Sequence, residues 1–312
     1  MTPFRLIGDP HITRKFEFGV PLNRRGERER LLFKDFRERL WEGDEELVIM
    51  VGDLFEKPTC AIPDLHKALS IILDAANLQP KRTFVMMAGN HDISSQADKK
   101  SAFDVLMLFD NLIDNLEVIK TPKIVKDIAL FPWEWSRTAL EQLADLKGQA
   151  FSAAVGHWDL TDFGTGHLCP AKELLDMGCS EIYSGHWHIP GEYKVDGVKV
   201  ICTGSMQPMN HAEDPDHKLY ITISSDEYED YDKSLLKDMY VRVITKSPDE
   251  EIESPDNCLG FKVQVKANEN LIESEVELDR FNLKEIIDKN FAESEVPDHI
   301  IKEVKEKLDD AA

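Results

Sequence analysis

The 312-residue sequence lacks the features of membrane proteins, disulfide-rich secreted proteins and thiolate-zinc proteins. No apolar run approaches the roughly 20 residues of a membrane span, and the N-terminus shows no charged-then-apolar signal pattern. The five cysteines are odd in number and form no CxxC pair, which argues against a disulfide framework and a thiolate zinc site. We therefore expect a cytoplasmic protein with no membrane association.

The sequence also has few basic residues for a protein that binds nucleic acid. Its 37 Lys and Arg face 59 Asp and Glu, giving a net charge of −22, whereas nucleic-acid binders are usually basic. The acid is concentrated in residues 213–312, with thirteen Lys/Arg against twenty-eight Asp/Glu, while residues 1–41 hold ten Lys/Arg against six Asp/Glu. By itself, the basic stretch 24–30 is best interpreted as a solvated helix face.

Short apolar runs alternate with amphipathic stretches over the first two hundred residues. The expected strands are 4–7, 47–51, 83–88, 128–131, 152–155 and 181–184, and the expected helices are 26–41, 63–76 and 103–112. This alternation predicts an α/β fold whose sheet is covered by helices. The all-apolar runs are typical of strands that are buried on both faces.

After about residue 190 the pattern becomes richer in strands. Residues 193–202 predict two strands around an Asp-Gly turn, and further strands are expected at 219–224, 240–244 and 261–265. From Asn282 the chain predicts two amphipathic helices, which Asn282 and Glu285 begin with a capping box. Their apolar stripes must pack either on their own domain or on a partner helix.

Five segments place metal-type ligands at, or just after, the end of an expected strand. They are Gly8-Asp9-Pro10-His11, Gly52-Asp53, Gly89-Asn90-His91-Asp92, Gly156-His157 and Gly185-His186-Trp187-His188. In α/β sheets such groups gather beyond the carboxyl ends of the strands. The glycines allow sharp turns there, and His186 and His188, two apart on an extended chain, would point to the same side.

The chemistry of these ligands indicates a pair of cations. Carboxylate and imidazole ligands without thiolates suit Mn²⁺, Fe²⁺ or Zn²⁺. Seven ligands are too many for one ion but suit two that share Asp53 as a bridge, and such a pair clamps a phosphoryl group. Each segment alone is most simply a turn, so the prediction depends on the ordered set of five.

The ordered motifs resemble the calcineurin-like metallophosphoesterase superfamily. Segments 156–160 and 184–188, with Thr203-Gly204-Ser205 after them, resemble more narrowly the SbcD-type nucleases, especially the recombination endonuclease subunits of tailed bacteriophages. The resemblance covers roughly residues 1–225. It implies a four-layer α/β sandwich with two central sheets in residues 1–205, a small β-rich capping domain in 206–275 and a helical tail in 276–312.

The resemblance also implies a role for each site residue. One ion would be held by Asp9, His11, Asp53 and His188, and the second by Asp53, Asn90, His157 and His186. The family metal is usually Mn²⁺, with Mg²⁺ as an alternative. His91 would protonate or stabilise the leaving oxygen, and Asp92 would orient its ring. Many cellular relatives have Gly-Asp-Leu-Phe-His at the second motif, where this sequence has Glu56.

The implied function is a Mn²⁺-dependent DNA nuclease, with double-strand exonuclease and single-strand endonuclease activity, in an SbcCD-like repair and recombination complex. Such subunits form homodimers, here through helices around 63–76 and 99–112, and their tail binds an SbcC-like ATPase of the SMC type. If the protein is encoded by a phage, it would act in the host cytoplasm. Two alternatives remain: a phosphoesterase for small molecules or phosphoproteins, and a non-catalytic DNA-end scaffold.

Overall fold

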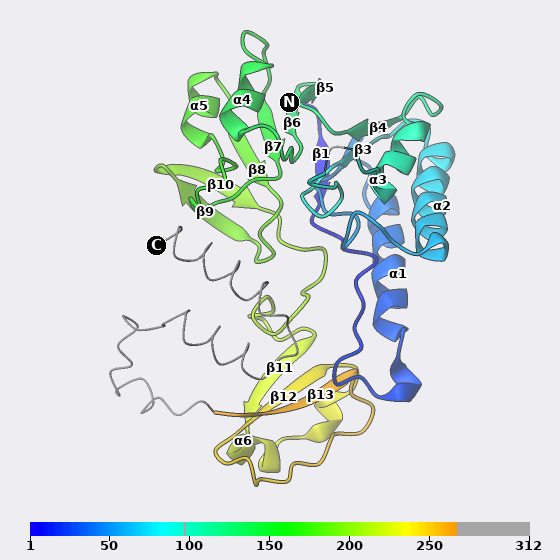
Figure 1. Cartoon of the computed structure of the whole chain (residues 1–312), viewed down its shortest axis with the longest axis vertical. Coiled ribbons are helices and arrows are strands. Elements are labelled where there is room, and N and C mark those ends of the chain that lie inside the picture. The colour runs from blue at the N-terminus through cyan, green and yellow to red at the C-terminus, as the bar shows by residue number, and fades with distance from the viewer. Residues whose placement is uncertain (97, 267–312) are drawn as a thin grey trace, which may run out of the picture. The chain divides into compact units, whose positions relative to one another are not determined.

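The computed structural model describes residues 1–96 and 98–266. The expected helical tail and the last residues of the expected capping domain lie outside these ranges. The strands form three sheets with the orders β1-β2-β3-β4, β5-β6-β7-β8-β10-β9 and β11-β12-β13 (Figure 1). Within the described ranges, every helix is too short or too polar to cross a bilayer.

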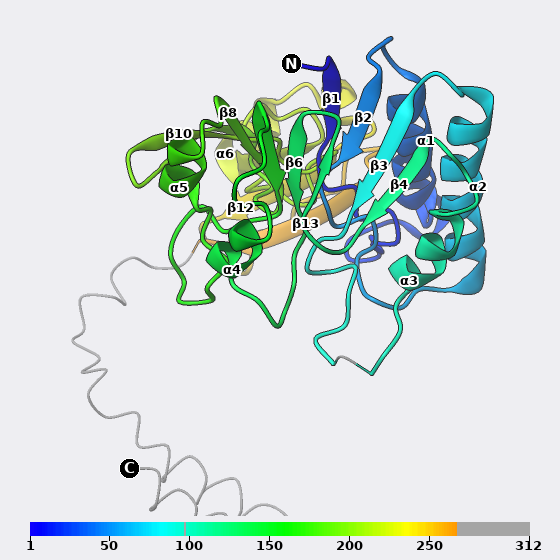
Figure 2. The same cartoon turned by 90° about the horizontal axis from the view of Figure 1, so that it is seen from above.

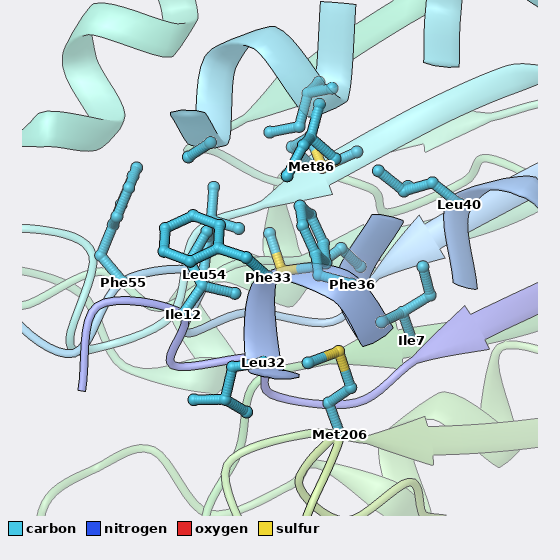
Figure 3. Packing of buried hydrophobic residues seen from close by; sticks show 14 of the residues in the cluster. Ile7, Ile12, Leu32, Phe33, Phe36, Leu40, Leu54, Phe55, Met86 and Met206 are labelled. Atoms are coloured by element: carbon cyan, nitrogen blue, oxygen red, sulfur yellow. The ribbon is translucent and has the colours of Figure 1, made fainter. Parts of the chain in front are cut away.

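The first sheet is parallel throughout and carries its helices on one face. Its strands are β1 (Phe4–Ile7), β2 (Leu47–Met50), β3 (Thr83–Met87) and β4 (Leu116–Ile119). The helices that connect these strands are α1 (Glu27–Trp41), α2 (Ile62–Leu78) and α3 (Ala102–Leu106), together with the short 3-10 helices η1 (Leu22–Arg24) and η2 (Met107–Phe109). Figure 3 shows Phe33 and Phe36 of α1 among Ile7, Met86 and Met206, in the core between helices and sheet.

One helix differs from its expected length. The expected helix 103–112 is α3 followed by the 3-10 turn η2. Beyond this turn, Asp110 Oδ1 accepts the backbone N–H of Val118 at 2.6 Å. Asp110 thereby ties the end of the turn to β4 instead of continuing the helix.

The second sheet mixes parallel strands with two antiparallel edges. Its strands are β5 (Lys123–Val125), β6 (Ile128–Phe131), β7 (Ala153–Gly156), β8 (Glu181–Ser184), β9 (Gly191–Val195) and β10 (Val198–Cys202). The helices α4 (Ala139–Ala144) and α5 (Ala171–Asp176) cover it. Asp196 and Gly197 both have positive φ, as a two-residue hairpin between β9 and β10 requires, so the expected Asp-Gly turn is confirmed.

The two sheets pack face to face, with helices on both outer faces (Figure 2). Along β2, Val48 and Met50 point to the helices, whereas Leu47 and Ile49 pack against the second sheet. This alternation buries both faces, which explains why the strand is apolar at every position. The expected α/β sandwich of four layers is therefore confirmed.

The third sheet forms the small β-rich unit that follows. It consists of the parallel strands β11 (Tyr220–Ser224), β12 (Tyr240–Thr245) and β13 (Gly260–Val265), with α6 (Ser225–Asp230) and η3 (Lys233–Leu236). Its own core contains Ile223, Leu236 and Val243. We call residues 206–266 the cap, and residues 1–205 the sandwich.

Two arginines, one in η1 and one in α1, contact residues of the cap. Arg24 Nη2 lies 2.6 Å from Asp238 Oδ1. Arg28 is buried, and its guanidinium donates to the carbonyl of Pro208 at 3.0 Å and to the side-chain oxygen of Gln207. The interpretation of this stretch as a solvated helix face is therefore wrong for Arg28.

Candidate metal centre

The ends of five strands bring the expected ligand side chains together. Asp9 and His11 follow β1, Asp53 follows β2, Asn90 follows β3, His157 follows β7, and His186 and His188 follow β8. Both sheets thus contribute to one edge of the sandwich. The central residue is Asp53, whose Oδ2 lies 3.6 Å from His11 Nε2 and 3.3 Å from His157 Nε2. Asp53 therefore lies between His11 and His157, and its role as a bridging ligand stays a prediction.

The first group of possible ligands consists of Asp9, His11 and His188, whose ligand atoms lie within 4.8 Å of one another. The Nε2 atoms of the two histidines are 3.1 Å apart. Asp9 is completely buried, and its Oδ2 accepts the backbone N–H of His186 at 2.8 Å. Its Oδ1 has no hydrogen-bond partner in the part of the chain that the structure describes, so one carboxylate oxygen remains for a cation.

The second group consists of Asp53, His157 and His186, which meet the same distance limit, together with Asn90. Asn90 Oδ1 lies 2.9 Å from His157 Nε2 and 3.0 Å from His186 Nδ1. The two groups share Asp53 as a neighbour. All seven expected side chains are thus in one site, while their role as ligands stays a prediction.

The ring nitrogens that face away from these groups contact acceptor oxygens. His11 Nδ1 lies 3.0 Å from Glu56 Oε2, and His188 Nδ1 lies 3.1 Å from Glu213 Oε1. The His11–Glu56 contact is poorly aligned for a hydrogen bond, so its attraction is mainly electrostatic.

The outer ring nitrogens of the remaining two histidines also contact acceptor oxygens. His186 Nε2 donates to Asp159 Oδ1 at 3.1 Å, and His157 Nδ1 donates to the Val51 carbonyl at 3.0 Å. Sequence reasoning did not assign the outer carboxylates, Glu56, Asp159 and Glu213, to the site. Asp159 lies within the Gly-His-Trp-Asp motif and could have been noticed there, whereas Glu213 has no local signal.

These outer contacts determine where the imidazole protons lie. Carboxylates lie beside the Nδ1 atoms of both His11 and His188. In each neutral ring this contact favours the tautomer with its proton on Nδ1. In the neutral rings both Nε2 atoms then carry lone pairs, which face each other at 3.1 Å. Two lone pairs at this distance repel unless a proton or a cation lies close to both. The arrangement fits a cation held by nitrogen and carboxylate oxygen.

Burial and charge shift the pKa values of several groups. Burial raises the pKa of Asp9, and the neighbouring Asp53 charge adds to this rise. Burial would also raise the pKa of Asp53, but His157 and His11 outweigh it and lower that pKa. Burial would lower the pKa of His157, yet Asp53 raises it to about 9. The negative charge at Asp53 is thus compensated by the neighbouring histidines.

Two glycines leave room for the ligands. A Cβ on Gly89 would lie 2.2 Å from Asp53 Oδ1, and a Cβ on Gly52 would lie 2.1 Å from His157 Nδ1. Gly52 also has a φ of +123°, which is unfavourable for other residues. At Gly89 the close approach of the Asp53 carboxylate, rather than a sharp turn, requires glycine.

The backbone of the site residues is itself unusual. His11, Asp53 and His186 have φ values of 43°, 50° and 72°, a left-handed region that residues other than glycine rarely adopt. The expectation that residues 186–188 form an extended chain is therefore wrong. The backbone N–H of Trp187 donates to the carbonyl of Gly185 at 2.9 Å, and this tight turn places His186 in the second group and His188 in the first.

His91 and Asp92 lie beside the second motif. His91 Nδ1 donates to the carbonyl of Glu56 at 2.7 Å, and its backbone N–H donates to Asp53 Oδ1 at 2.8 Å. The Glu56 carbonyl is thus the group that orients the His91 ring. The expectation that Asp92 orients this ring is wrong. The buried Asp92 carboxylate instead accepts the N–H groups of Leu54, Phe55 and Gly89. Burial and the Asp53 charge raise the pKa of Asp92 to about 7.

Comparisons with known proteins add a likeness to solved structures. No family model matches the sequence, and no significant match is found among curated proteins. The nuclease MPE of Pseudomonas putida is similar over 65% of this chain and 73% of its own, at 15% identity and a TM-score of 0.31. Vacuolar Protein Sorting 29 from Cryptosporidium parvum is similar over 69% and 80%, at 14% identity and a TM-score of 0.31. Likeness at this level says nothing of the activity of this chain.

Proposed function

We propose that this chain is a hydrolase of the calcineurin-like metallophosphoesterase type that cleaves phosphodiesters with two divalent cations. The observation that supports this most directly is the 3.1 Å distance between His11 Nε2 and His188 Nε2, beside Asp9 Oδ1, which has no hydrogen-bond partner among the described residues. The first ion would be held by Asp9, His11, Asp53 and His188, and the second by Asp53, Asn90, His157 and His186. The metal we propose is Mn²⁺, with Mg²⁺ as an alternative.

The two ions, when bound, would neutralise phosphate oxygens and lower the pKa of a water molecule. The chain provides the fixed frame for this chemistry. Glu56, Asp159 and Glu213 lie beside the outer nitrogens of three of the imidazoles, which favours the tautomer of the neutral ring whose inner nitrogen can bind a cation.

His91 is the residue that we propose as the proton donor. A carbonyl can only accept, so the Glu56 carbonyl fixes a proton on His91 Nδ1. Nε2 is therefore the atom that can carry a second proton and deliver it to the leaving oxygen. Asp92 joins the loops after β2 and β3 through backbone N–H groups, and is a positioning residue in this proposal.

The more specific proposal is an SbcD-type DNA nuclease. It is supported by the motifs at 156–160, 184–188 and 203–205. We further propose that residues 276–312 bind an SbcC-like ATPase, which would supply the DNA contacts that a chain of charge −22 lacks, and that the complex works in the bacterial cytoplasm.

We also propose a homodimer through α2 and residues 99–112. Large apolar side chains are exposed on these segments, including Ile62 (80%), Leu78 (67%), Leu108 (68%) and Leu112 (74%). Sedimentation that shows only a 35.6 kDa species would contradict the dimer.

The test compares wild type, His91→Ala and the exposed control His66→Ala with Mn²⁺ on linear duplex DNA, single-stranded DNA, a nucleotide diester and a phosphopeptide. We expect wild type and the control to cleave DNA, and His91→Ala to lose about 10²- to 10⁴-fold in kcat while Mn²⁺ and DNA still bind.

Three outcomes would contradict parts of the proposal. Cleavage by His91→Ala at the wild-type rate would remove His91 from the chemistry. Hydrolysis of the phosphopeptide or the nucleotide diester without hydrolysis of DNA would favour a phosphoesterase for small molecules or phosphoproteins. Hydrolysis of no phosphodiester by wild type would favour the DNA-end scaffold.

A further inference from the structure

Two large aromatic side chains are exposed beside the metal centre. Trp135 is 46% exposed and Phe163 is 63% exposed. Each rests on a second aromatic ring. Trp135 meets Trp133 edge-on, with centroids 5.4 Å apart, and Phe163 stacks on Trp187 at 6.3 Å with an interplanar angle of 18°. Both exposed rings are therefore held in place by a more buried aromatic ring.

The two supporting rings adjoin the candidate ligands. Trp133 is buried, and its ring centroid lies 5.2 Å from that of His186. Trp187 lies between His186 and His188 in the chain. The indole N–H of Trp135 also donates to the carbonyl of Ile93 at 3.3 Å, two residues after His91. The Trp133 ring thus contacts both Trp135 and His186, and the ring that supports Phe163 belongs to the residue between His186 and His188.

The segment that carries these rings offers little positive charge. Residues 132–168 contain two Lys or Arg and five Asp or Glu. Arg137 lies 3.5 Å from Glu134 and 2.8 Å from Asp145, so its charge is already compensated. A polyanion that reaches the metal centre along this side gains little from its phosphates. The exposed Trp135 and Phe163 rings of this segment offer π-faces to a ligand instead.

We propose that Trp135 and Phe163 form a stacking subsite for unpaired nucleobases next to the scissile phosphodiester. The ligand is single-stranded nucleic acid or a frayed duplex end. The inference rests on the proposed phosphodiesterase function and names its substrate class. Stacking tolerates any sequence because every base has a π-face, so the subsite selects unpaired strands without selecting a base sequence.

The experiment measures binding of a fluorescein-labelled single-stranded oligonucleotide to the full chain by anisotropy in EDTA, and KM and kcat with Mn²⁺. A second oligonucleotide of the same length carries abasic residues in place of the terminal nucleosides. The variants are Trp135→Leu, Trp135→Phe and Phe163→Leu. The matched controls are Trp41→Leu on α1, which is 42% exposed, and Phe18→Leu, which is 81% exposed.

We expect Trp135→Leu to raise Kd and KM for the intact oligonucleotide roughly 10-fold, and Phe163→Leu to raise them about 5-fold, as loss of one stacked base predicts. Abasic residues should weaken the binding of the oligonucleotide to wild type by a similar factor. The loss of affinity from abasic residues and the loss from Trp135→Leu should not add. Trp135→Phe should retain affinity within about 3-fold, which separates stacking from the lost Trp135–Ile93 hydrogen bond. The two controls should bind as wild type does.

Two results would overturn the subsite: equal wild-type affinity for intact and abasic strands, or additive losses in Trp135→Leu. Normal binding of the intact strand by Trp135→Leu would exclude Trp135 from the subsite. Wild type that hydrolyses no substrate but binds the intact strand more tightly than the abasic strand in EDTA would support the subsite and contradict the proposed function. Failure of the subsite and failure of the proposed function are therefore distinguishable.

Discussion

The carboxyl edge of the sandwich and the surface of the cap arrange their charged groups in opposite ways. At the carboxyl edge of the sandwich, Asp9 and Asp53 are 0% and 1% exposed, and histidines are their neighbours. In the cap, the ion pair of Lys246 and Asp226 has side chains that are 70% and 69% exposed. Buried carboxylates are costly unless they are compensated by positive charge, whereas solvated ion pairs contribute little. The difference indicates that the edge of the sandwich is organised for binding rather than for stability.

Asp53→Asn should have the largest effect, because Asp53 contacts both ligand groups. We expect Mn²⁺ binding to weaken by more than about 100-fold and hydrolysis to fall to background. In wild type, Mn²⁺ at 100 times its Kd should raise the free energy of unfolding by about 2.7 kcal/mol, and Asp53→Asn should lose this gain. Calorimetric titration and thermal unfolding measure both quantities, with Asp226→Asn in the cap as control. Wild-type Mn²⁺ affinity in Asp53→Asn would contradict the bridging role.

Glu56→Gln, Asp159→Asn and Glu213→Gln should have intermediate effects. Each removes the negative charge that holds the outer nitrogen of one histidine, and we expect Mn²⁺ affinity to fall about 10- to 100-fold with little change in folding. The exposed Glu192→Gln is the control. If all three variants titrate Mn²⁺ as wild type does, the outer carboxylates do not position the ligands.

Arg28→Ala tests the junction between α1 and the cap. The substitution leaves the Pro208 carbonyl and the Gln207 side chain without their donor, and we expect it to lower the free energy of unfolding by about 1–3 kcal/mol. Urea unfolding measures the change, with the exposed Arg30→Ala on the same helix as control. Equal stability of the two variants would show that the buried guanidinium contributes no more than a solvated one.

Lys246→Ala should have the smallest effect. Its partner Asp226 lies on the surface of the cap, and an exposed ion pair is screened by solvent and salt. We expect the same melting temperature as wild type at physiological ionic strength. A clear loss of thermal stability would show that the surface charges of the cap matter more than the comparison with the sandwich indicates.

Much of the fold follows from local patterns. The strands β1, β2, β3, β6, β7 and β8 were expected from short runs rich in apolar residues, and β2, β3, β6 and β7 are the ones buried on both faces. The strand β4 was missed because Glu117 interrupts its apolar run at the edge of the sheet. Helix α6 was also missed, since its six residues are mainly acidic. The available signal for α6 was the capping box of Ser224 and Glu227, which the structure contains.

The sequence by itself determined the types of the candidate ligands, their order and their places at the ends of strands, because residue chemistry and apolar periodicity are local properties of the chain. The resemblance already implied that His186 and His188 enter different groups, whereas only the tertiary structure showed that Glu56, Asp159 and Glu213 stand behind the histidines. These contacts join the ends of strands from two sheets and, through Glu213, the start of the cap. Such meetings depend on how the layers pack, and no local pattern encodes that packing.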